Sequence, residues 1–166
     1  MGGALVRGPT VPRDSNGMPV LDEIRYNNVS YLTVTADFTS ATWNTVASHE
    51  LFTVTGDVRV RVIAKSTGAG TGATATAKLG IAGGLTWIAA TTITDMAANE
   101  WWYDTTPTTT QDTTATVMFD KLIANGQDIG YEIETAAATG GGVIFHCWWQ
   151  PISSDGAVVV GAGGTL

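Results

Sequence analysis

The chain of 166 residues is long enough for one domain with a substantial core. Only 14% of its residues are charged and 44% are hydrophobic, a balance that argues against a disordered chain. The formal net charge of −7 argues against a protein whose main work is to bind nucleic acid, because that binding depends on Lys and Arg.

Residues 1–28 are predicted to form an extended N-terminal arm. Three prolines stiffen its first twenty residues, and a proline-stiffened strip loses little entropy when it docks on a partner. A frayed end is the alternative. The residues that we expect to contact a partner are the apolar and basic side chains spaced along this strip: Leu5, Val6, Arg7, Val11, Arg13 and Val20.

Between residues 29 and 152 apolar and polar residues alternate with a period of two, which predicts strands with one buried face. Turn signals separate the segments, and short strands at this spacing predict an all-β antiparallel sandwich, jelly-roll-like in form. No helical periodicity stands out. The predicted strands lie in residues 28–38, 56–64, 73–83, 85–93, 112–122, 128–135 and 141–151.

The clearest alternation occurs in residues 56–64, where the apolar face holds Val58 and Val60. The opposite face carries Arg59 and Arg61, with Lys65 following, and we expect it to face solvent. Carboxylates of an adjoining strand are the expected partners of these cations, and residues 132–134 show a matching alternation of Glu. Contact with an acidic partner surface is the alternative.

Residues 153–166 are apolar, rich in glycine and uncharged after Asp155, and they are predicted to form a C-terminal tail outside the sandwich. An apolar tail in water would be a liability, so we expect it to lie against a neighbour. A frayed end is again the alternative.

The single cysteine, Cys147, excludes an intrachain disulfide and fits a reducing cytoplasm. His146 precedes it, but neighbours on a strand point to opposite faces, so the two cannot form a nucleophilic pair there. We expect Cys147 to pack as a small buried group. No catalytic residue, metal ligand or cofactor is predicted, although a hydrolase with a carboxylate pair assembled in three dimensions stays an alternative.

Six tryptophans are many for this length, and four of them form the adjacent pairs Trp101–Trp102 and Trp148–Trp149. On a strand, each pair would place one ring inside and one outside. Outward rings suit sugar stacking or a protein interface. They keep open a carbohydrate- or receptor-binding module as an alternative function.

Four phrases stand out as a set: LFTVTGDV, DMAANEWWYDTTP, IANGQDI and WQPISSDG. Over residues 49–160 the chain resembles a group of small virion structural proteins of tailed bacteriophages. The resemblance implies a non-enzymatic decoration or cement protein that binds the major capsid protein on the outer head shell and links capsomers. It also implies assembly in the host cytoplasm and a symmetric homo-oligomer, with a trimer favoured. The first residues lack the apolar core of a signal peptide, and no apolar run suggests a membrane partner.

Overall fold

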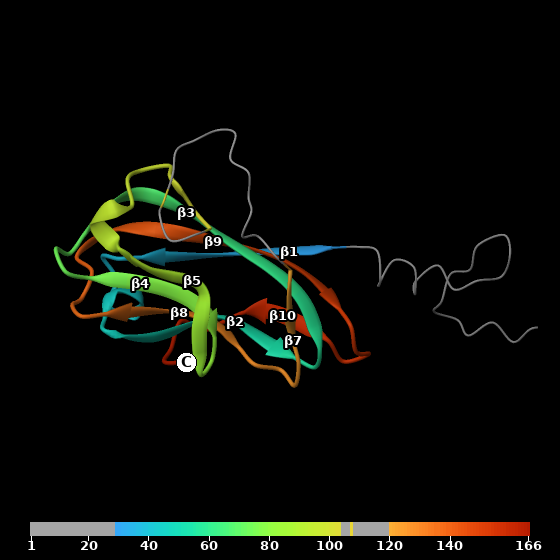
Figure 1. The fold of residues 1–166 in the computed structure, drawn as a ribbon. Helices are drawn as coiled ribbons and strands as arrows, with labels where there is room; N and C mark the ends of the chain where they lie inside the picture. The colour runs from blue at the N-terminus through green and yellow to red at the C-terminus, as the bar shows by residue number, and fades with distance from the viewer. Residues whose placement is uncertain (1–28, 104–106, 108–119) are drawn as a thin grey trace, which may run out of the picture.

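The computed structural model describes residues 29–103, 107 and 120–166, which form two antiparallel sheets packed face to face (Figure 1). The predicted arm, with its six expected contact residues, lies outside the described residues. So does most of the predicted strand at 112–122. The all-β sandwich itself is confirmed.

The first sheet has the strand order β1-β9-β3-β6, and β7 also pairs with β3. β3, β9 and β1 form the upper layer in Figure 1. The strands of this sheet are β1 (Ser30–Asp37), β3 (Val58–Thr71), β6 (Trp101–Trp102), β7 (Lys121–Ile123) and β9 (Gly140–Pro151).

The second sheet has the strand order β10-β2-β8-β4-β5. A short helix, α2 (Ala41–Asn44), and a 3-10 turn, η1 (Ile93–Asp95), lie in the connections. The strands of this sheet are β2 (Ala47–Thr55), β4 (Thr76–Ile81), β5 (Gly84–Thr92), β8 (Ile129–Glu134) and β10 (Ala157–Val160).

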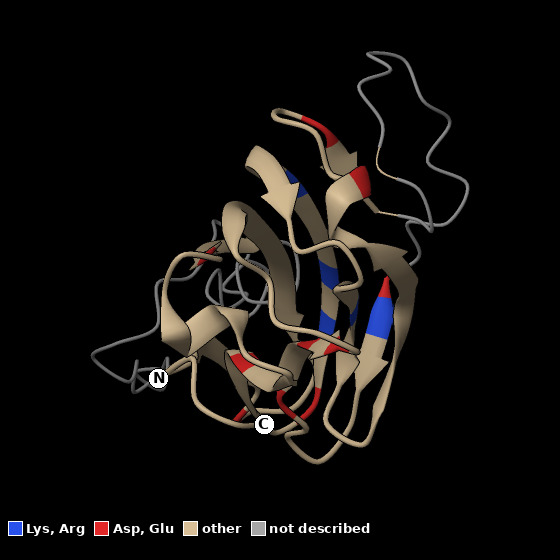
Figure 2. Ribbon diagram, turned by 90° about the vertical axis from the view of Figure 1, so that its left-hand side faces the viewer, with Lys and Arg blue, Asp and Glu red and all other residues tan. Residues whose placement is uncertain are grey.

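The core lies between the inner faces of the two sheets. Phe145 of β9 and Tyr131 of β8 are fully buried, and their rings stack with centroids 5.3 Å apart, so they join the layers directly. Val58 and Val60 point into the same core, as their alternation predicts. No Asp, Glu, Lys or Arg is among the buried residues of the described chain, and charged residues colour only a small part of the ribbon (Figure 2).

The C-terminal segment differs from its prediction as a tail outside the sandwich. Residues 157–160 form β10, which pairs with β2 at the edge of the second sheet. Further on, Thr165 bridges to His49, and the Leu166 amide donates to the Ser48 carbonyl. Backbone pairing therefore holds this segment against its own domain, and Val158 is buried there, whereas Val159 and Val160 stay about half exposed.

β2 was not predicted as a strand, and its geometry explains why. The pairing of β2 with β8 shifts register between Glu50 and Phe52. Such an irregularity breaks the strict alternation of inward and outward side chains. Leu51 and Phe52 are consecutive and both fully buried, so the segment has no period of two at this point.

Candidate functional site

The outer face of the first sheet carries a row of large side chains. In the strand register, Tyr31 of β1 lies opposite Trp148 of β9, and Trp148 lies opposite Arg61 of β3. Asp120, just before β7, accepts a hydrogen bond from Arg61 and forms an ion pair with it. Arg61 and Trp148 each follow a buried residue on their strands, Val60 and Cys147, so the sheet aims these two side chains away from the core.

Four rings gather on this face, and we call them the aromatic cluster: Tyr31, Trp101, His146 and Trp148. Ring centroids lie 5.3 Å apart for Tyr31 and Trp148, 5.6 Å for Trp101 and His146, and 6.0 Å for His146 and Trp148. The ammonium group of Lys65 sits 5.2 Å from the centre of the Trp101 ring, within reach of a cation–π interaction.

His146 is held neutral at the centre of the aromatic cluster. Burial lowers the pKa of His146, and the nearby charge of Lys65 lowers it further. The Tyr31 hydroxyl lies 2.7 Å from Nδ1 of His146, while Nε2 is buried with no partner in the part of the chain that the structure describes. When the hydroxyl donates to Nδ1, the imidazole proton sits on Nε2.

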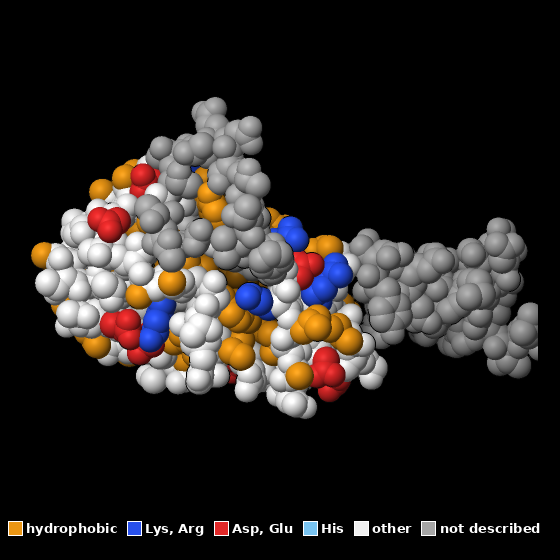
Figure 3. Space-filling view, in the orientation of Figure 1, with side chains coloured by type: hydrophobic (Ala, Val, Ile, Leu, Met, Phe, Trp, Pro, Cys, Tyr) orange, Lys and Arg blue, Asp and Glu red, His pale blue; other side chains and the backbone are white. Residues whose placement is uncertain are grey.

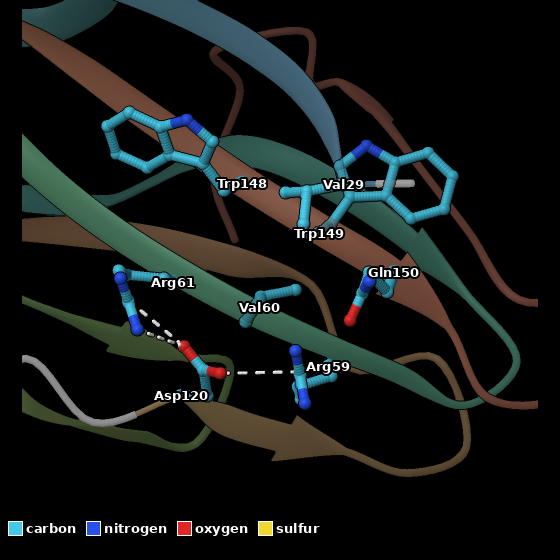
Figure 4. Close-up of a pocket in the computed structure, with 8 residues that line it drawn as sticks. All are labelled: Val29, Arg59, Val60, Arg61, Asp120, Trp148, Trp149 and Gln150. Atoms are coloured by element: carbon cyan, nitrogen blue, oxygen red, sulfur yellow. Dashed lines mark hydrogen bonds and ion pairs between the residues drawn. The ribbon is translucent and has the colours of Figure 1, made fainter. Parts of the chain in front are cut away.

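Next to the aromatic cluster lies a hollow of about 290 Å³ (Figure 4). We call it the arginine hollow. The Asp120 carboxylate lies between the guanidinium groups of Arg59 and Arg61, and the Trp148 indole lies beyond Arg61. The hollow is lined by Val29, Arg59, Val60, Arg61, Asp120, Trp148, Trp149 and Gln150.

The arginine hollow has an excess of positive charge. Asp120 Oδ1 accepts from Nε of Arg61 at 3.0 Å and lies 2.9 Å from its Nη2, whereas Oδ2 lies 3.3 Å from Nε of Arg59. Two guanidinium groups therefore share one carboxylate. Exposed ion pairs of this kind contribute little to the stability of the fold. The guanidinium groups can therefore exchange the contact with Asp120 for a contact with a bound group at little cost. Figure 3 shows basic side chains beside an acidic one and among hydrophobic groups.

The prediction that a carboxylate from an adjoining strand pairs with Arg59 and Arg61 holds for Asp120, beside β7, but the choice of Glu132 and Glu134 as those carboxylates was wrong. Glu132 and Glu134 lie on β8 in the second sheet, where both pair with Lys78, at 2.9 and 2.7 Å. Lys78 donates hydrogen bonds to Glu134 and to Glu132, and both raise the pKa of Lys78, the bond to Glu134 more than the other. β3 and β8 belong to different sheets and are not neighbours. The similar alternation of charges in the two segments was therefore no sign that they pair.

The predicted burial of Cys147 is confirmed, since the residue is fully buried and points into the core. Burial raises the pKa of the Cys147 thiol to about 12, so the thiol stays protonated at neutral pH. His146 occupies the outer face of the same strand. Within the described ranges, no group of three His, Cys, Asp or Glu side chains is placed to hold a metal ion.

The tryptophan pairs divide between core and surface. Trp102 is fully buried and Trp101 is half-buried on the outer face, as predicted for adjacent residues. Trp148 and Trp149 are both half-buried, and both line the arginine hollow. The sequence identified outward rings, but the meeting of Tyr31 with His146 and Trp148 depends on a register that no local pattern encodes.

A second surface lies where one edge of the first sheet, β1, meets one edge of the second sheet, β10. β1 and β10 contact each other, and neither has a second strand partner among residues 29–103 and 120–166. We call these two strands the open edges. Large apolar residues are about half exposed on or beside them: Val29, Tyr31, Ile152, Val159 and Val160.

Comparison of the chain with protein-family models, curated proteins and solved structures found no match. The resemblance to phage virion proteins therefore stays a prediction. No helix in the described part of the chain is long and apolar enough to cross a membrane.

Proposed function

We propose that this protein is a non-enzymatic structural component of a bacteriophage virion, a decoration or cement protein of the outer head shell. The observation that carries the proposal is the pair of open edges. β10 has no charged residue and β1 has only Asp37, at its end. Natural proteins protect exposed edges with charge, proline or a cover, so uncharged edges indicate surfaces that a neighbour occupies.

The neighbour that fits the open edges is a second copy of this chain. Each copy carries a formal net charge of −7, so copies repel one another over most of their surface. The uncharged edges are where two copies approach at least cost, with main-chain pairing and exposed valines as the contacts. A closed ring of copies, with a trimer favoured, would then bind the major capsid protein through the arm of residues 1–28.

The jelly-roll part of the fold prediction is supported by how the strand pairs nest. β1 pairs with β9, β2 with β8, β3 with β7, and β4 with β5, and these pairs alternate between the two sheets. A chain folded back on itself and wrapped into two sheets gives this nesting, and β10 adds one strand at an edge. Jelly rolls occur in viral capsids and in lectins, so the fold suits a shell protein without deciding between these roles.

The second candidate is a carbohydrate- or receptor-binding module of a phage fibre or tail. The aromatic cluster and the arginine hollow favour it, because rings beside charged groups on one face of a sandwich suit sugar binding.

Electron microscopy of purified virions, labelled with an antibody against the full chain, would separate the two candidates. We expect label over the head shell, in agreement with assembly in the host cytoplasm followed by attachment to the capsid surface. Label on tails or fibres would favour the second candidate. Virions that carry no label, although the chain is present in the infected cell, would overturn both.

A further inference from the structure

We propose that the arginine hollow binds an acidic sugar, one pyranose unit bearing a carboxylate, as in uronic or sialic acids. The inference rests on the hollow itself and not on where the protein sits in a virion, so it goes beyond the proposed shell function. The binding test below and the labelling test above can therefore fail independently.

The charge of the hollow selects an anion. Arg59 and Arg61 supply two positive charges, and Asp120 neutralises one of them. The side chains of both arginines are nearly half exposed, and Arg59 contacts Asp120 through Nε. The terminal nitrogens of Arg59 have no partner among the described residues, and they present the fork of donors that binds a carboxylate with two parallel hydrogen bonds.

The aromatic wall selects a ring rather than a bare anion. The Trp148 indole lies directly opposite Arg61 across the β3–β9 pair, so a group bound to the guanidinium is placed beside the indole. An indole face offers a large apolar surface to the C–H face of a sugar. The carboxylate of Asp120 is a polar group within the same hollow that can accept hydrogen bonds from sugar hydroxyls, and Gln150 lies opposite Arg59 on the wall of the hollow.

The size of the hollow limits the ligand. Its volume of about 290 Å³ lies just below the range for sites that hold drug-sized ligands, ~300–1,000 Å³. One sugar unit fits this space and a longer chain does not. Further units of an oligosaccharide would leave the hollow and run over the outer face, where Tyr31 is half exposed.

Titration of the full chain with methyl glucuronide, methyl glucoside and inorganic phosphate, followed by NMR of the indole N–H signals, tests the inference. We expect the glucuronide to shift the Trp148 signal saturably and to bind at least about tenfold tighter than either other probe, since a charge-assisted bond adds more than ~1.4 kcal/mol. Equal binding of the glucoside would overturn the role of the arginines. Equal binding of phosphate would show a plain anion site and overturn the sugar.

Matched variants locate the binding. We expect Arg61→Gln and Trp148→Ala each to weaken glucuronide binding at least about tenfold. Lys65→Gln removes a charge from the same strand and face outside the hollow, and Trp101→Ala removes a ring of the aromatic cluster outside it; both should bind as the wild type does. Unchanged circular dichroism confirms that each variant folds. Weakening by the controls as large as by the two hollow variants, or no saturable shift in the wild type, would overturn the proposal.

Discussion

The Tyr31 hydroxyl lies 2.7 Å from Nδ1 of His146, across the β1–β9 pair. This contact joins the edge strand of the first sheet to the middle of the aromatic cluster. At His146, burial and the charge of Lys65 both disfavour the protonated imidazole and lower its pKa. The stability of this face should therefore depend on pH.

We expect the free energy of unfolding to fall as the pH is lowered through the ordinary pKa of histidine, 6.5, towards the lower pKa of folded His146. The unfolded chain binds a proton in this window before the folded chain does, so acid favours unfolding and the contribution is complete only above 6.5. Urea denaturation at a series of pH values measures the trend. His146→Gln should remove that part of the slope, and an NMR titration placing the His146 pKa above 6.5 would contradict the argument.

The buried thiol gives a chemical prediction. Because Cys147 is fully buried and its pKa is raised to about 12, Ellman's reagent should label it at neutral pH only after the chain unfolds. Cys147→Ser should cost about 1–3 kcal/mol of stability, since a hydroxyl would be buried without a good partner. Denaturation curves measure that cost. Fast labelling of the native protein would show that the site is accessible.

Gly70 gives a prediction about packing. A Cβ atom at this position of β3 would collide with the backbone carbonyl oxygen of Ile93, in η1, and would come within 2.8 Å of its side chain. Backbone cannot move aside as a flexible side chain can, so Gly70→Ala should destabilise the domain by about 1–3 kcal/mol or more. Gly84→Ala is the matched control, because nothing lies within 4 Å of the added atom. Equal stability of the two variants in thermal melts would refute the close approach.

The clearest of the strands that the sequence predicted, in residues 56–64, begins with one buried face and one exposed face. Val58 and Val60 alternate with exposed arginines, so local pattern and final burial agree. β10 escaped prediction for the opposite reason. Val158 is buried while Val159 and Val160 are both exposed, because an edge strand is covered unevenly. A run of three valines followed by glycines has no alternation from which this could be read.

The candidate site depended on pairings between distant segments. The sequence placed Arg59 and Arg61 on a solvent face, which is correct. Their carboxylate, Asp120, lies 59 residues from Arg61 along the chain, and only the pairing of β7 with β3 brings it near. The alternation along β9 is enough to predict that Trp148 points outward. That it lies beside Tyr31 and Arg61 depends on the order of the strands in the sheet.

The ends of the chain should behave differently when they are removed. Deleting residues 1–20 should leave a soluble β domain with near-native circular dichroism, while attachment to shells weakens at least about tenfold, or ~1.4 kcal/mol. Deleting residues 157–166 should instead unfold the domain, because it removes β10 and uncovers β2. Co-sedimentation with purified shells measures attachment. Equal occupancy by the wild type and the 1–20 deletion would show that the globular part makes the contact.

The open edges make the sharpest test of self-association. Val159→Lys places a charge on β10, where the proposed contact between copies needs an apolar, pairable edge, so the oligomer should dissociate. Leu122→Lys is the matched control: Leu122 is 73% exposed, on β7 of the first sheet, which is not one of the open edges. Light scattering coupled to gel filtration should give trimers for the wild type and for Leu122→Lys, and monomers for Val159→Lys. A wild type that is monomeric at micromolar concentration and stays monomeric on the shell would refute self-association. A Val159→Lys trimer would place the contact on another surface.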